Sequence, residues 1–173
     1  MKVNRNTEEK RDIYRLHVSL RQLVDALYKL RMIELNKYRI SPEQAAAIIC
    51  ISNIGEKATP AEISRWLFRE RHSVLVLLRR MEKLGLIKMA PNIKNKHSII
   101  VSLTEKGREA YQDVAQFHYA VDVIGTLPKK KREQLYSLLQ VLRNRAFKNL
   151  KLNARANAQL TAAIMFPFSD IEE

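Results

Sequence analysis

The sequence predicts a mainly α-helical fold with one small β-hairpin. Three observations support this prediction: 46% of the 173 residues are hydrophobic, the chain has only four glycines and five prolines, and two short apolar strands stand between helix signals near its centre. Such a hydrophobic fraction is typical of folded chains, and few glycines and prolines leave little material for long loops. The length fits one ordinary domain, or a small domain with attached oligomerisation helices.

The first predicted element is a helix over residues 8–37. Its apolar residues recur at alternating spacings of three and four, at Ile13, Leu16, Leu20, Leu23, Leu27 and Leu30. A narrow stripe of this kind is typical of a helix that packs lengthwise against other helices. A helix of about 30 residues spans about 45 Å, which is more than a small domain covers. We therefore expect partner helices from later in the chain or from a second copy.

Two further helices are predicted from their first residues. Residues 41–44 read Ser-Pro-Glu-Gln, and residues 59–62 read Thr-Pro-Ala-Glu. Each segment places proline after a hydroxyl residue and glutamine or glutamate three residues after it, which is the pattern of a capping box at a helix start. The first of these helices ends near Gly55. The second directs its apolar residues Ile63, Trp66 and Leu67 inward.

A fourth helix is predicted over residues 71–84, with Gly85 as its stop. At about 100° per residue, one side is apolar and faces inward, with Val74, Leu77, Leu78, Met81 and Leu84. The opposite side carries His72, Val76, Arg79 and Lys83, with Leu75 and Arg80 at its margins.

A hairpin follows this helix. Its predicted strands are residues 86–89 and 99–103, and the loop 90–98 between them contains Lys94, Lys96 and His97 but no acid. Two short helices followed by a small hairpin form a winged helix-turn-helix, a shape that places one helix in the major groove of DNA and a loop beside it.

Two helices are predicted after the hairpin. Thr104 caps one that continues through Ile124, and Pro128 opens another that extends to Phe147. Their apolar stripes are not needed to complete the winged core, and a monomer would expose them as a large patch, so we expect a homodimer. Residues 149–166 are alanine-rich and weakly helical. The expected organisation is a dimerisation helix over 1–40, a winged helix-turn-helix DNA-binding domain over 41–106, and C-terminal helices of the dimerisation region over 107–173.

The charge is strongly positive. The chain has 31 Lys and Arg against 18 Asp and Glu, a formal net charge of +13. Residues 57–108 alone hold twelve basic and four acidic residues. Such a distribution favours a polyanionic partner, with nucleic acid as the commonest, although a basic surface that is merely solvated is the alternative. The cluster Lys129 to Arg132 is interpreted as solvated, because cations at a helix start oppose the helix dipole.

Other classes of function lack sequence support. The single cysteine, Cys50, lies in an apolar run without a basic neighbour and is interpreted as a buried structural thiol in a reducing compartment. Histidines 17, 72, 97 and 118 form no metal-ligand spacing, and no nucleotide-binding or catalytic motif is present, so we expect neither a metal, a cofactor nor an enzyme. No apolar run is long enough to span a bilayer and no apolar signal core precedes the first helix, which predicts a cytoplasmic protein.

Two segments carry a family resemblance. Residues 80–87, Arg-Met-Glu-Lys-Leu-Gly-Leu-Ile, and residues 103–107, Leu-Thr-Glu-Lys-Gly, resemble the segments that enter and leave the wing in the MarR (multiple antibiotic resistance regulator) family. The resemblance implies a homodimer that binds a pseudo-palindromic site in double-stranded DNA and represses transcription. It also implies release from DNA on binding a small-molecule effector.

The chain departs from the family pattern at several positions. Glu70 stands where a small hydroxyl residue usually caps the recognition helix, and Phe68 stands where glycine is favoured. Leu75 and Val76 occupy positions where polar groups commonly reach bases. Lys96 replaces the wing arginine, and lysine is a more hydrated and less directional cation than arginine.

The resulting site prediction has two parts. Arg71, His72 and Ser73 at the helix start are expected to meet bases and phosphates, and Arg79 and Lys83 to clamp phosphates. Leu75 and Val76 either contact thymine methyl groups or pack on the neighbouring helix. The full set of predicted DNA-binding residues is Arg71, His72, Ser73, Leu75, Val76, Arg79, Arg80, Lys83, Lys94, Lys96 and His97.

The effector site is expected in the crevice between the dimerisation helices and the winged domain, near Tyr14, His17, Trp66 and Phe117.

The alternative function is a winged-helix adaptor that uses the helix with Leu75 and Val76 to bind protein. Binding to DNA falls steeply with salt, whereas an apolar protein interface varies little, and this difference separates the two hypotheses.

Overall fold

The computed structural model describes residues 5–55, 58–92 and 95–151, and the side chains of all of these except residues 5 and 95–97. The helices are α1 (Arg5–Asn36), α2 (Pro42–Ile54), α3 (Pro60–Leu67), α4 (Arg71–Lys83), α5 (Glu105–Val114), α6 (His118–Ile124) and α7 (Lys129–Asn149). The strands are β1 (Ile87–Asn92) and β2 (Asn95–Leu103). The mainly helical fold with one hairpin that the sequence predicts is therefore confirmed.

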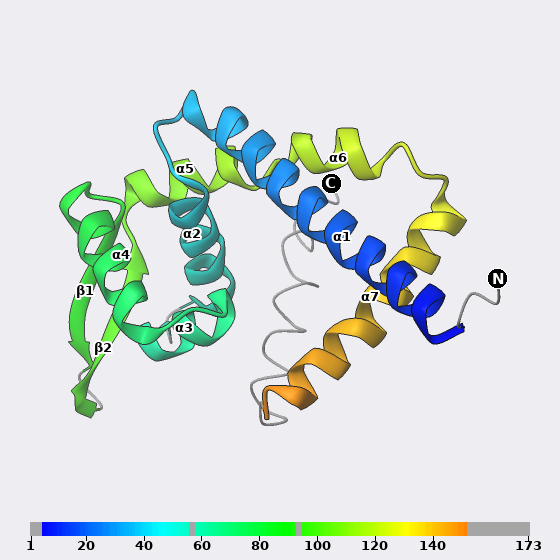
Figure 1. Ribbon diagram of the computed structural model, residues 1–173. Coiled ribbons are helices and arrows are strands. Elements are labelled where there is room, and N and C mark those ends of the chain that lie inside the picture. The colour runs from blue at the N-terminus through cyan, green and yellow to red at the C-terminus, as the bar shows by residue number, and fades with distance from the viewer. Residues whose placement is uncertain (1–4, 56–57, 93–94, 152–173) are drawn as a thin grey trace.

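Two parts of the molecule can be distinguished in Figure 1. Helices α2, α3 and α4 gather with the hairpin into a winged half, and α1 extends from this half as a long arm. Helix α5 leads from the winged half to α6, which packs on α1. Helix α6 and the start of α7 lie at the side of the molecule away from the hairpin.

The two predicted capping boxes are both present. The Ser41 hydroxyl accepts a hydrogen bond from the backbone N–H of Gln44, whose side chain accepts one from the backbone N–H of Ser41. Thr59 and Glu62 make the same reciprocal pair at the start of α3. These bonds satisfy N–H groups that have no partner within the helix, and so they fix where α2 and α3 begin.

The hydrophobic core lies in the winged half. The core contains residues from the end of α1 through α5. Its fully buried members include Leu35, Ile48, Ile63, Leu78, Met81, Val101 and Val114. The backbone N–H of Val101 in β2 also donates to the carbonyl of Ala58 before α3, at 2.8 Å. Burial and this bond attach the hairpin to the helices, so the winged half is one packed unit.

The hairpin is longer than the sequence predicts. Strands β1 and β2 pair antiparallel from Ile87 opposite Leu103 to Pro91 opposite Ile99, with a register shift before Asn92 and Asn95 pair. The expectation of a loop over residues 90–98 is therefore wrong for most of that segment. Pro91 lies in β1 of a two-stranded sheet, where a strand has only one paired edge and tolerates a residue without an N–H.

A single helix from 104 to 124 is also not observed. Helix α5 ends at Val114, and Phe117 adopts a left-handed conformation with φ 52° before α6 begins at His118. The Arg31 side chain reaches from α1 to the carbonyl of Val114. This contact, across 83 positions of sequence, gives the last carbonyl of α5 a partner outside the helix, and the chain turns there.

The two long helices, α1 and α7, expose apolar side chains. In α1, Ile13 is 59% exposed and Leu16 is 65% exposed, and in α7 Leu138 is 64% exposed and Leu142 is 55% exposed. Near its end α7 does touch the winged half, because the ring of Phe147 stacks on that of Phe68 with centroids 5.6 Å apart. The predicted stripes of α1 and α7 are thus mostly uncovered in one chain, with Leu27 and Phe147 half-buried. The stripe predicted after the hairpin is different, because Val114 is fully buried in the winged core and Phe117 is half-buried.

Candidate nucleic-acid interface

The turn between α3 and α4 is held by backbone and side-chain contacts. Phe68 ends α3 in a left-handed conformation with φ 51°. This is the position where the family that the sequence resembles favours glycine. The N–H of Arg69 donates to the carbonyl of Ser64 at 3.1 Å, and the Ser64 hydroxyl donates to the carbonyl of Arg69 at 2.6 Å. These paired contacts close the turn and set the direction in which α4 leaves it.

The start of α4 has no side-chain cap. Glu70 occupies the capping position in an extended conformation, and its carboxylate makes no capping hydrogen bond. The first N–H groups of a helix then remain directed outward, where they and the helix dipole favour an anion. Arg71, His72 and Ser73 in this first turn are all exposed.

The two sides of α4 differ as the sequence predicts, with one exception. Val74, Leu78 and Met81 are buried, and Leu77 is half-buried. Leu84, predicted to face inward, is 49% exposed, because α4 ends at Lys83 and Leu84 is its C-cap. The sequence pattern extended the helix by one residue and so assigned Leu84 to the wrong surface.

The exposed side of α4 carries four cations. Arg71, Arg79, Arg80 and Lys83 are exposed, and no ion pair within the described part of the chain joins any of them to an acid. Their charges are therefore not neutralised locally. Leu75 and Val76 are half-buried, and a cleft of about 360 Å³ lies beside Val76, Arg80, Ser73 and Arg69.

The hairpin is fastened to the end of α4. Glu82 accepts a hydrogen bond of 2.8 Å from the backbone N–H of Met89 in β1. Thr104 Oγ1 donates to the carbonyl of Gly85 at 2.6 Å, and Lys106 Nζ donates to the carbonyl of Leu84 at 2.9 Å. The two segments that carry the family resemblance thus contact each other, and they fix the hairpin relative to α4.

The predicted basic residues of the wing lie partly outside the described residues. Lys94 is outside the described residues. For Lys96 and His97, only the backbone is described, and it lies within β2. Their predicted role in DNA binding stays a prediction.

An apolar cavity of about 440 Å³ lies between the arm and the winged half. Trp66 and Phe117, both predicted near such a site, line it together with Val24, Leu27, Tyr28, Arg31, Cys50 and Tyr119. Tyr14 and His17, also predicted, are exposed on α1 and are not among the lining residues. The spacing of residues 24, 27, 28 and 31 could have revealed the wall, because it places them on one face of α1.

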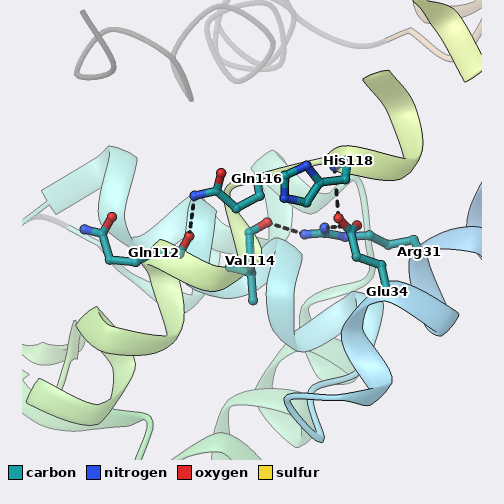
Figure 2. Close-up of polar contacts among 6 residues, drawn as sticks. All are labelled: Arg31, Glu34, Gln112, Val114, Gln116 and His118. Carbon is teal, nitrogen blue, oxygen red and sulfur yellow. Dashed lines mark hydrogen bonds and ion pairs between the residues drawn. The ribbon is translucent and has the colours of Figure 1, made fainter. Parts of the chain in front are cut away.

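The cavity borders a buried cation. Figure 2 shows Arg31 between Glu34 and the carbonyl of Val114, to which its guanidinium donates. Arg31 Nη1 lies 2.8 Å from Glu34 Oε2, and Glu34 Oε1 accepts from the N–H of His118 at 2.9 Å. The guanidinium also lies 4.7 Å from the ring centroid of Phe117 and 5.4 Å from that of Tyr119. These contacts join α1 to both sides of the break between α5 and α6.

A second polar cluster involves Tyr28, which lies on the same face of α1 as Arg31. The Tyr28 hydroxyl donates to Glu43 Oε1 at 2.8 Å, and Arg69 Nη2 lies 3.5 Å from the same oxygen. Burial opposes ionisation of Glu43, but the hydrogen bond from Tyr28 and further polar contacts outweigh it and lower the pKa of the carboxyl. Glu43 is therefore a carboxylate at neutral pH.

Cys50 is 1% exposed in the wall of the cavity. Burial, and secondly the carboxylate of Glu62, raise the pKa of this thiol far above its ordinary value. A protonated, buried thiol reacts poorly with oxidants, which fits the interpretation of a structural cysteine.

In the parts of the chain that the structure describes, no three His, Cys, Asp or Glu side chains form a metal-binding group, and no helix is long and apolar enough to cross a membrane.

Comparison with known proteins supports the same architecture. Residues 40–107 match the family described as the winged helix DNA-binding domain. No curated protein sequence is significantly similar to the chain.

Three solved structures illustrate the similarity of fold. The organohalide-sensing transcriptional regulator RdhR-CbdbA1625 in its 2,4-dichlorophenol-bound form is 25% identical, with 76% of this chain and 79% of that chain covered and a TM-score of 0.70. The transcriptional regulator SlyA is 17% identical, with coverages of 79% and 96% and a TM-score of 0.72. A MarR-like transcription regulator from Bacillus cereus is 19% identical, with coverages of 78% and 98% and a TM-score of 0.69.

Proposed function

We propose that this chain, whose residues 40–107 match the winged helix DNA-binding domain and whose fold is similar to that of MarR-type regulators, is a homodimeric transcriptional repressor that binds a pseudo-palindromic site in double-stranded DNA. Helix α4 enters the major groove, and the hairpin reaches the neighbouring backbone. The observation that carries the proposal is the exposed side of α4, with four cations that no acid neutralises within the described residues and a helix start without a side-chain cap.

The residues of α4 take different roles in this proposal. Arg71, His72 and Ser73 contact bases and phosphates at the helix start, where free N–H groups add to the attraction. Arg79, Arg80 and Lys83 bind phosphates and fix the register. Leu75 and Val76, both half-buried, contact thymine methyl groups with their exposed portions.

Homodimer formation would bury the apolar stripes of α1 and α7. Side chains such as Leu16 and Leu138 are each more than half exposed in one chain, and a patch of this extent is uncommon on the surface of a monomer. A dimer also presents two copies of α4, and the spacing of half-sites by about ten base pairs, or a multiple, follows from that geometry.

The apolar cavity is proposed as the effector site. Its lining is mainly aromatic and aliphatic, with the Arg31 guanidinium at its border. A volume of about 440 Å³ is within the range of small-molecule sites. RdhR-CbdbA1625, which has a similar fold, binds 2,4-dichlorophenol. We therefore propose a small aromatic molecule as the class of effector.

The test is to sequence the DNA fragments that the purified full chain retains, and to titrate the enriched fragment against salt. Enrichment of a pseudo-palindromic sequence is expected, and affinity should fall by about 10³-fold or more between roughly 50 and 200 mM salt through counterion release. Uniform recovery of all fragments would reduce the function to non-specific binding. Binding to a protein with little dependence on salt would favour the adaptor instead.

Two variants separate the roles along α4. Lys83→Gln, as a lost phosphate contact, should weaken binding to all sequences and reduce the salt slope by about one unit. Arg71→Gln, as a lost base contact, should also relax the preference at one position of the site. Equal loss of preference in both variants would contradict this assignment.

A further inference from the structure

Polar contacts connect the wall of the apolar cavity to the turn that precedes α4. Tyr28 in α1 lines the cavity, and its hydroxyl donates to Glu43 at the start of α2. The carboxylate of Glu43 in turn pairs with Arg69 in the turn between α3 and α4. Three elements that are separate in sequence are therefore linked through one carboxylate oxygen.

Arg69 is placed where it affects the start of α4. Both the backbone N–H and the carbonyl of Arg69 are hydrogen-bonded to Ser64. The next residue, Glu70, does not cap α4 with its side chain. Because a local cap is missing, the position of the first turn of α4 depends on the turn before it.

An open cleft lies beside these contacts. This cleft has a volume of about 240 Å³ and is lined by Tyr28, Pro42, Glu43, Ala46, Leu67 and Arg69. Because this cleft is open to solvent and the Arg69 side chain is 52% exposed, packing restrains that side chain little. The hydrogen bond and the ion pair are thus the specific contacts that hold the Arg69 side chain.

We propose that Tyr28 and Glu43 are positioning residues for DNA binding, which act by holding Arg69 and, through it, the start of α4 in the orientation that fits the major groove. The inference rests on the proposed function of α4, and it adds two residues that lie outside the predicted DNA-contacting set. Since Tyr28 also lines the apolar cavity, a molecule that moves its ring would disturb the same contacts.

The sign of the effect of Glu43→Gln distinguishes positioning from simple electrostatics. An acid near a DNA-binding surface repels phosphates, so its removal ordinarily strengthens binding. Positioning predicts the opposite result, a loss of affinity of several-fold. Glu70→Gln is the matched control, because Glu70 is an exposed acid beside the same helix start without a side-chain cap bond, and it should bind DNA equally well or more tightly.

A double-mutant cycle then tests the route through Arg69. Tyr28→Phe should weaken DNA binding several-fold when Arg69 is present and should have little effect in the Arg69→Gln background. Tyr28→Phe removes no charge, so the salt slope should stay unchanged. Tyr14→Phe, an exposed tyrosine on the same helix, should change affinity in neither background. Fluorescence anisotropy with the enriched DNA fragment gives the affinities, and circular dichroism verifies that each variant is folded.

Stronger binding by Glu43→Gln, or an equal effect of Tyr28→Phe in both backgrounds, would overturn the inference while the proposed function stands. Failure of the unaltered chain to bind any DNA would overturn the proposed function and this inference with it.

Discussion

Gly107 stands where α4, the hairpin and α5 meet. A Cβ atom at this position would lie 2.0 Å from the carbonyl oxygen of Leu86 and 3.3 Å from the Cβ of Leu103. The first contact is with backbone, which cannot rotate away as a side chain can. Gly107 therefore permits the close approach that brings Thr104 and Lys106 to the carbonyls at the end of α4.

Gly107→Ala is expected to lower the free energy of unfolding by about 2–3 kcal/mol, because the backbone must move to admit the methyl group. Denaturant unfolding at fixed protein concentration measures the change. The control is Gly85→Ala, where no atom lies within 4 Å of the added Cβ but φ is +73°. That variant should cost only about 1–2 kcal/mol from the left-handed backbone. A smaller loss for Gly107→Ala than for Gly85→Ala would contradict the steric explanation.

At the scale of single elements, the sequence predicts what local residues determine. The starts of α2 and α3 follow from capping boxes within four residues, so both were predictable. The break between α5 and α6 was not, because it involves Arg31, which is distant in sequence and packs beside the left-handed Phe117. The length of the hairpin was also missed, since pairing across Pro91 and Ile99 follows from the register and not from local residue preference.

Arg31→Met should detach α1 from the break between α5 and α6. Only 7% of the Arg31 side chain and 12% of that of Glu34 is exposed, so the change leaves a carboxylate and a carbonyl without their partner in a buried place. A loss of about 3 kcal/mol or more in the free energy of unfolding is expected. Arg21→Met is the matched control, because Arg21 pairs with Asp25 on the exposed surface of the same helix, and it should change stability by about 0.5 kcal/mol or less. Similar losses in the two variants would exclude a special role for Arg31.

At the scale of the whole molecule, the stripes predicted for α1 and α7 are present and mostly exposed, and the residues that the structure describes do not cover them. The period of apolar residues shows which face of a helix is buried, but it carries no information on which chain supplies the opposing surface. For the same reason, the wall of the cavity was only partly predictable. Trp66 and Phe117 were expected there, while Tyr119 and Tyr28 were missed because α1 and α6 meet only in the folded protein.

The dimer is tested on α7. Substitution of two exposed leucines, Leu138→Glu with Leu142→Glu, should convert the protein from twice the mass of one chain to a single chain in light scattering. Affinity for the DNA site should fall in parallel, since one chain reads one half-site. Asn144→Glu, on the opposite side of the same helix, should leave the mass unchanged. A monomeric unaltered chain, or a double variant that stays dimeric, would contradict the proposed assembly.

The position of Trp66 has a practical consequence. It is the single tryptophan of the chain and it borders the apolar cavity. Indole emission responds to the polarity of its surroundings, so a compound that displaces solvent from this space would alter the intrinsic spectrum of the native protein at one defined point. Screening of aromatic compounds would therefore need no attached dye, and occupancy could be followed separately from any signal on the nucleic acid.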